Sequence, residues 1–120
     1  MTHGRWDLAA SVERLIAFRR ARDWEQFHRP KELAAALAIE AAELQELFLW
    51  KPEESATDVR ADSERFGRVE EELADVVIFA SMLAHDLDID LAAAIGRKID
   101  TNDRRYPVEE HRGVARKAGR

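Results

Sequence analysis

Four acidic residues stand where the helical pattern of this sequence would place apolar side chains. They form two pairs with the same i, i+3 spacing, Glu40 with Glu43 and Glu72 with Asp75, so each pair shares one face of a helix. Each pair falls inside an apolar stripe, made by Leu33, Leu37, Leu44 and Leu47 in the first case and by Val69, Val76, Phe79 and Leu83 in the second. Ionised carboxylates on an apolar face are costly unless something compensates their charge.

A bound cation is the compensation that these residue types favour. Four carboxylate ligands suit a hard ion such as Mg²⁺, with Mn²⁺ as the alternative. The chain contains no cysteine, which excludes a thiolate site. Helical di-iron proteins place His three residues after a ligand Glu, whereas those positions here hold Glu43 and Asp75. The competing interpretation is that some of these acids extend into solvent or pair with arginines.

A basic cluster near the C-terminus could bind phosphates. Lys98, Asn102 and Arg105 are spaced i, i+4, i+7 and therefore share one helix face, with Tyr106 beside it. Lysine and arginine suit phosphate oxygens, and asparagine and tyrosine can contact a base or a sugar. The alternative is a solvated helix end, where basic side chains complement the helix dipole.

An aromatic cluster surrounds the first acidic pair in the sequence. Trp24, Phe27 and His28 precede the pair, and Trp50 follows it. Rings offer a flat apolar surface on which a nucleotide base can stack. The alternative is that these tryptophans fill the core of a small domain.

Four helices would position these residues. Apolar residues at helical spacing predict helices over residues 7–22, 30–50, 63–86 and 91–106, and Pro30 suits the first turn of the second helix. The polar stretch 51–64 is predicted as a loop, and either Asp88 or Asp90 as the cap of the fourth helix. No strand-like alternation of useful length occurs. The expected fold is an all-α, four-helix bundle over residues 1–107, followed by a mobile basic tail over 108–120.

Composition limits the function further. The 120 residues suit one domain, and the net charge of −5 disfavours binding to nucleic acid. No apolar run is long enough to span a membrane, and the N-terminus lacks the layout of a secretory signal peptide, so we expect a cytoplasmic protein. The apolar faces exceed what four helices can cover, which predicts a homo-oligomer.

Three segments resemble a known family. RDWEQFHRPKELAAALAIEAAELQELFLWK, followed in order by EELADVVIFASMLAHDLDID and KIDTNDRRYP, resembles the dCTP pyrophosphatase branch of the MazG-like all-α pyrophosphohydrolases, over about residues 18–107. The resemblance implies Mg²⁺ ligands at Glu40, Glu43, Glu72 and Asp75, and a nucleotide pocket lined by Trp24, His28, Trp50, Lys98, Asn102 and Tyr106. It also implies dimers or tetramers of intertwined helices, with sites at subunit contacts.

The expected function is that of a magnesium-dependent enzyme. It would hydrolyse a nucleoside triphosphate to the monophosphate and pyrophosphate. The preferred substrate would be dCTP or a modified dCTP. Either Glu40 or Glu43 would activate the attacking water, while Lys98 and Arg105 would steady the phosphates. The alternatives are the same chemistry on another base or a broad range of nucleotides, and a non-catalytic helical interaction module. A tetramer is favoured over a dimer.

Overall fold

Every regular element in the described part of the chain is a helix. The computed structural model describes residues 7–118, and the all-α class predicted from the sequence is confirmed. The described residues form two compact units, residues 7–87 and 88–118, and each is described by itself. None of these helices has both the length and the apolar character needed to cross a membrane.

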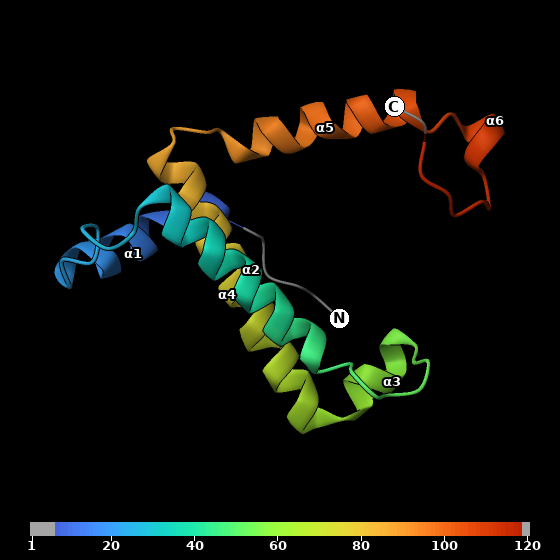
Figure 1. Cartoon of the computed structure of the whole chain (residues 1–120), viewed down its shortest axis with the longest axis horizontal. Helices are drawn as coiled ribbons and strands as arrows, with labels where there is room; N and C mark the ends of the chain where they lie inside the picture. The colour runs from blue at the N-terminus through green and yellow to red at the C-terminus, as the bar shows by residue number, and fades with distance from the viewer. Residues whose placement is uncertain (1–6, 119–120) are drawn as a thin grey trace. The chain divides into compact units, whose positions relative to one another are not determined.

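The first unit is built on two long antiparallel helices, α2 (Pro30–Glu46) and α4 (Ser63–Asp86), which lie side by side (Figure 1). Pro30 occupies the first turn of α2, where its missing N–H leaves no hydrogen bond unmade. Asp62 caps α4 by accepting a hydrogen bond from the backbone N–H of Arg65 at 3.2 Å. The bounds of α4 are those predicted from its long apolar periodicity.

Helix α1 (Leu8–Ala21) packs against α4 and closes a small core. Asp7 caps α1 by accepting from the N–H of Ala10 at 3.1 Å. The predicted helix over 7–22 is confirmed to within one residue at each end. The buried centre of the core consists of Ile16, Leu33 and Met82, one from each helix, and is surrounded by the partly buried Val12, Leu15, Ile78, Phe79 and Leu83.

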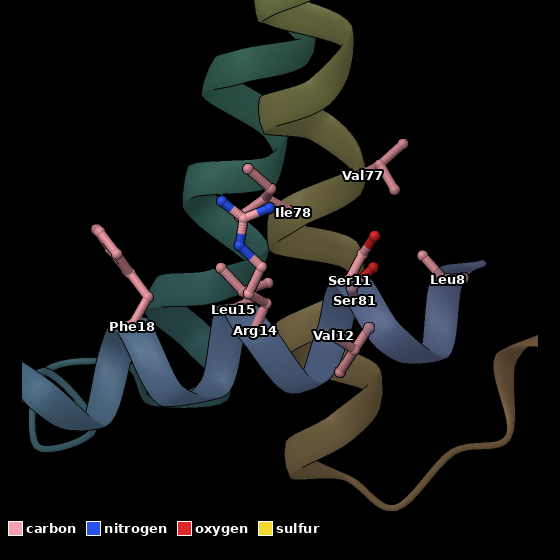
Figure 2. Close-up of a pocket in the computed structure, with 9 residues that line it drawn as sticks. All are labelled: Leu8, Ser11, Val12, Arg14, Leu15, Phe18, Val77, Ile78 and Ser81. Atoms are coloured by element: carbon pink, nitrogen blue, oxygen red, sulfur yellow. The ribbon is translucent and has the colours of Figure 1, made fainter. Parts of the chain in front are cut away.

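An apolar groove of about 420 Å³ remains open between α1 and α4 (Figure 2). Its walls are Leu8, Ser11, Val12, Arg14, Leu15, Phe18, Val77, Ile78 and Ser81. The Ser81 Oγ is buried there without a hydrogen-bond partner among the described residues. No carboxylate is among the described residues that line this groove, so it is distinct from the acidic cluster described below.

The end of α2 corrects the first of two predictions about this region. The helix was expected to reach Trp50, but it ends at Glu46, and residues 47–50 form turns. Trp50 itself has a φ of 63°, which no right-handed helix can accommodate. The apolar periodicity continues through these residues, so hydrophobic spacing alone overestimates the length of the helix.

The second correction concerns residues 51–64, predicted as a loop. They contain a short helix, α3 (Ala56–Ala61), held by a capping box. Ser55 Oγ accepts from the N–H of Asp58 at 3.2 Å, and Asp58 Oδ2 accepts from the N–H of Ser55 at 3.1 Å. This reciprocal pair satisfies two backbone donors that a helix start would leave unpaired, and it stabilises a helix without any apolar stripe.

The second unit contains α5 (Leu91–Arg105) and α6 (Val108–His111). Asp90 caps α5 by accepting from the N–H of Ala93 at 3.0 Å, which selects one of the two predicted caps. Helix α5 agrees with the predicted helix over 91–106 to within one residue. Helix α6 falls inside the tail predicted over 108–120, so the first four residues of that tail are helical. The domain boundary at residue 107 stays a prediction.

Candidate functional site

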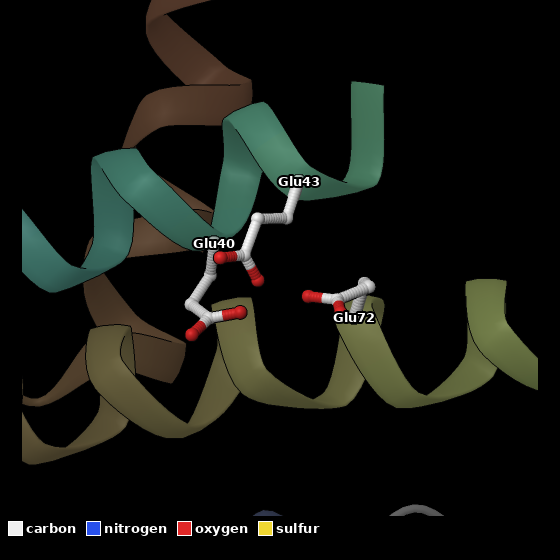
Figure 3. Close-up of side chains that lie close together, drawn as sticks. All are labelled: Glu40, Glu43 and Glu72. Atoms are coloured by element: carbon white, nitrogen blue, oxygen red, sulfur yellow. The ribbon is translucent and has the colours of Figure 1, made fainter. Parts of the chain in front are cut away.

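The antiparallel pairing of α2 and α4 brings three of the four predicted acids together. Glu40 and Glu43 lie one turn apart on α2, and Glu72 faces them from α4 (Figure 3). Each contributes a carboxylate oxygen, and these three oxygens lie within 4.8 Å of one another. The helical spacing aligns the first two, and the helix pairing supplies the third.

This cluster carries more negative charge than its surroundings neutralise. Glu40 and Glu72 are half-buried, and the Oε2 atom of each is buried without a hydrogen-bond partner among the described residues. The pKa of Glu40 is raised to about 7, chiefly because a proton on it can be shared with Glu72. Burial and the neighbouring charges of Glu43 and Asp75 raise this pKa further.

The donor set fits a hard cation. It consists of carboxylate oxygens alone, and two of the buried oxygens lack the hydrogen bonds that buried polar atoms normally make. A divalent cation would satisfy both oxygens and offset the repulsion between the three carboxylates. Asp75 lies one turn beyond Glu72, half-buried, and its charge acts on Glu40. It is not one of the three residues whose oxygens cluster within 4.8 Å.

The aromatic residues separate into two places. The Trp24 ring meets the His28 ring edge-on at a centroid distance of 6.1 Å and the Phe18 ring at 5.7 Å. Trp24 is 41% exposed, so it is not a core residue. Trp50 is 92% exposed and follows the opposite end of α2, a helix about 25 Å long at 1.5 Å per residue. One chain therefore does not bring Trp50 beside Trp24 and His28.

The predicted basic face lies in the second unit. Asn102 and Tyr106 are joined by a backbone hydrogen bond of 2.8 Å at the end of α5. The Arg105 guanidinium lies 5.7 Å from the centroid of the Tyr106 ring, and both residues are half-buried. Lys98 is exposed, two turns before Arg105. All four residues thus lie on the second half of α5 and its C-terminal cap, and their role in binding phosphate stays a prediction.

Sequence reasoning gave no role to two buried arginines that organise the first unit. Arg19 pairs with Asp86, and Arg65 pairs with Glu54. In each case the charged residue falls among apolar neighbours on a helix, which is the same signal that identified the acids. The partners lie 67 and 11 residues away, so helical spacing alone did not identify them.

Comparison with known proteins relates the chain to nucleotide pyrophosphatases. The sequence profile of the MazG-like family matches residues 35–120. The chain is 45% identical over 105 residues to dCTP pyrophosphatase 1 of Bos taurus, covering 87% of this chain and 62% of that protein. It is 41% identical over 107 residues to dCTP pyrophosphatase 1 of Homo sapiens, covering 88% of this chain and 63% of that protein. The chain thus spans less than two thirds of the length of these relatives.

A solved structure has the same fold. The crystal structure of a pyrophosphatase from Archaeoglobus fulgidus superimposes with a TM-score of 0.75 and 36% sequence identity. The match covers 89% of this chain and 98% of that one. The match therefore covers almost all of the archaeal protein, whereas it covers less than two thirds of the mammalian relatives.

Proposed function

This chain belongs to the MazG-like family, and we propose that it hydrolyses a nucleoside triphosphate to the monophosphate and pyrophosphate, with dCTP or a modified dCTP as the preferred substrate. The observation that carries the proposal is the cluster of Glu40, Glu43 and Glu72, with two buried oxygens that lack partners. The names of the mammalian relatives support the choice of dCTP.

The acidic cluster would hold Mg²⁺, with Mn²⁺ as an alternative, through Glu40, Glu43 and Glu72, and with Asp75 as the fourth acid. When bound, the cation offsets negative charge on the triphosphate and on the departing pyrophosphate. Since the chain has a net charge of −5, it needs such a local positive charge to hold a polyanion.

The remaining chemistry falls to the side chains themselves. One of the two α2 carboxylates, Glu40 or Glu43, accepts the proton of the water that attacks the α-phosphorus. Lys98 and Arg105 contact the phosphates, and Asn102 and Tyr106 contact the sugar or base. Trp24, His28 and Trp50 hold the base by stacking and edge contacts.

A homo-oligomer would complete this pocket. Within one chain Trp24 precedes the start of α2 and Trp50 follows its end, so a pocket that contains both draws them from two copies. The open apolar groove between α1 and α4 (Figure 2) supplies a surface for such an association. A tetramer is favoured over a dimer. We place the enzyme in the cytoplasm, acting on free nucleotides, with no nucleic-acid or membrane partner.

A pyrophosphate-release assay over a nucleotide panel tests the proposal. The 120-residue chain should release pyrophosphate from dCTP when Mg²⁺ is present and none when it is chelated. A second panel with dUTP, dTTP, ATP and modified dCTP measures the base preference. Absence of release from every nucleotide at saturating Mg²⁺ would support the alternative of a non-catalytic helical module.

A further inference from the structure

Trp50 holds a conformation that its own side chain does not favour. Its φ is 63°, in the left-handed region, and the residue is 92% exposed. Bulky residues rarely adopt this backbone conformation, and they keep it only where the surrounding structure determines it. Because its ring makes so little contact of its own, the backbone conformation of Trp50 must be set by its neighbours in the chain.

Those neighbours are fixed by Arg65, on the first turn of α4. The Arg65 Nη1 donates to the backbone oxygen of Leu47 at 3.2 Å and to Glu54 Oε1 at 3.0 Å. Its Nη2 donates to the other carboxylate oxygen of Glu54. One guanidinium therefore fixes the residue three positions before Trp50 and the residue four positions after it. It also lies 5.6 Å from the centroid of the Phe48 ring.

The chemistry of this contact makes it specific to arginine. Arg65 is only 8% exposed, and pairing with Glu54 keeps its pKa above the ordinary arginine value. A planar guanidinium can contact a carboxylate through two parallel hydrogen bonds and a carbonyl at the same time, whereas a lysine ammonium offers a point charge on a flexible stem. Asp62, 3.4 Å from Nε, adds an ion pair from the cap of the same helix.

We propose that Arg65 is the positioning residue for Trp50. Glu72 lies seven residues further along α4, on nearly the same face and about 10 Å along the axis. Helix α4 therefore carries both Glu72, an acid of the proposed cation site, and Arg65, which anchors the segment that contains Trp50. This inference rests on the proposed function where it concerns nucleotide binding, but the ordering of Trp50 is a property of the free chain.

The ordering can be measured without a substrate. Labelling the full chain with 5-fluorotryptophan gives one ¹⁹F resonance for each of its three tryptophans, and Trp50→Phe identifies that of Trp50. Arg65→Met, Arg65→Lys and Glu54→Gln should shift and sharpen the Trp50 resonance toward that of a mobile indole. Arg60→Met and Glu53→Gln, which alter exposed neighbours, should leave it unchanged.

Kinetics provide the second measurement. If a loosened Trp50 must be ordered again on binding, KM for dCTP should rise about three- to tenfold with little change in kcat, since ordering one side chain costs about this much affinity. An unchanged Trp50 resonance and KM in folded Arg65→Lys and Glu54→Gln would overturn the assignment. Should Arg65→Met not fold, those two variants decide. If the parent chain hydrolyses no nucleotide, the proposed function fails while the resonances still test the positioning.

Discussion

Arg19 on α1 donates two hydrogen bonds to the carboxylate of Asp86, the last residue of α4, at 2.8 Å from Nη1 and 2.7 Å from Nη2. The Arg19 side chain is 5% exposed, and that of Asp86 is 23% exposed. Arg19 and Asp86 are 67 residues apart in the sequence, and their ion pair joins α1 to α4. It therefore fixes α1 against the end of α4 at one edge of the core.

Removing this guanidinium should destabilise the fold. Arg19→Met should lower the free energy of unfolding by about 1–2 kcal/mol, less than for a fully buried pair because solvent screens part of the Asp86 carboxylate. Urea titration followed by circular dichroism measures the change. Arg20→Met, at the exposed neighbouring position, is the matched control. Equal midpoints for the two variants would contradict a stabilising role for the pair.

The same contact predicts a dependence on acid. The hydrogen bonds from Arg19 lower the pKa of Asp86 in the folded chain. A lowered carboxyl pKa stabilises the fold above the unfolded-state pKa, and this contribution is lost as pH falls through the folded-state value. The stability difference between the parent and Arg19→Met should therefore be full near neutrality and shrink below about pH 4.

The open apolar surface predicts self-association. Leu73 is 51% exposed and lies on α4 one turn before Val77, a residue of the α1–α4 groove. Sedimentation velocity at micromolar concentration should find an oligomer for the parent chain, and Leu73→Lys should shift it toward the monomer of 13.7 kDa. Glu71→Lys adds the same side chain at another exposed position of α4 and should leave the oligomer intact. A compact monomeric parent would refute the association.

Protonation of Glu40 should couple cation binding to pH. Its pKa is about 7 in the folded chain, against about 4.3 for an ordinary glutamate. Ionisation of Glu40 therefore lowers the stability of the cation-free fold as pH rises from about 4 through 7. Cation binding needs the ionised form, so the increase in Tm on adding Mn²⁺ should grow between about pH 6 and about pH 8. Glu40→Gln should flatten this dependence, and an equal increase at both pH values in the parent would contradict it.

Helical spacing predicted much of the fold, because long helices with an apolar stripe carry their signal locally. The bounds of α4 and the start of α2 at Pro30 agree with the structure. The sequence did not predict the short α3, because its six residues have no apolar stripe and are held by the Ser55–Asp58 capping box instead. The sequence did not predict the turn at Trp50, because we infer that its φ depends on the contacts of Arg65 from α4. A local sequence pattern does not contain such long-range contacts.

The candidate site divides in the same way. Glu40 and Glu43 were identified as acids inside an apolar stripe, and helix pairing then brought Glu72 to them. The sequence grouped Trp24 with Trp50 because both flank α2, but the length of this helix keeps the two tryptophans apart within one chain. The partner of Arg19 is set by how α1 packs on α4, and that of Arg65 by how the segment before α3 lies against α4, so helical periodicity could mark these arginines only as unusual.

Loss of a carboxylate charge at Glu40, or at Asp75 beside the acidic cluster, should abolish turnover and keep the fold. Glu40→Gln and Asp75→Asn preserve shape but remove an ionised oxygen donor, so pyrophosphate release should fall by at least about 100-fold. The cation-free variants should be no less stable than the parent, because repulsion among the acids is relieved. Glu46→Gln, exposed at the end of α2, should retain activity. Full turnover by either amide variant at saturating Mg²⁺ would sink the assignment.

The role of Trp24 can be separated from that of a core residue by two measurements on one variant. Trp24 is 41% exposed and meets Phe18 and His28 edge-on, so one part of its ring surface faces solvent. If a base stacks there, Trp24→Ala should raise KM for dCTP strongly and lower kcat less, because stacking holds substrate and transition state about equally. Loss of one stack costs about 1–3 kcal/mol, roughly five- to 150-fold in KM.

A tryptophan that only packs against the fold would behave differently on substitution. Its removal would lower Tm and leave KM near the parent value in whatever protein stayed folded. Trp24→Phe supplies the control, since a smaller ring keeps a stacking surface and should recover most of the loss in KM. Measuring Tm and KM on both variants therefore separates the two roles. An unchanged KM in folded Trp24→Ala would end the pocket assignment for this residue and leave the acidic cluster untouched.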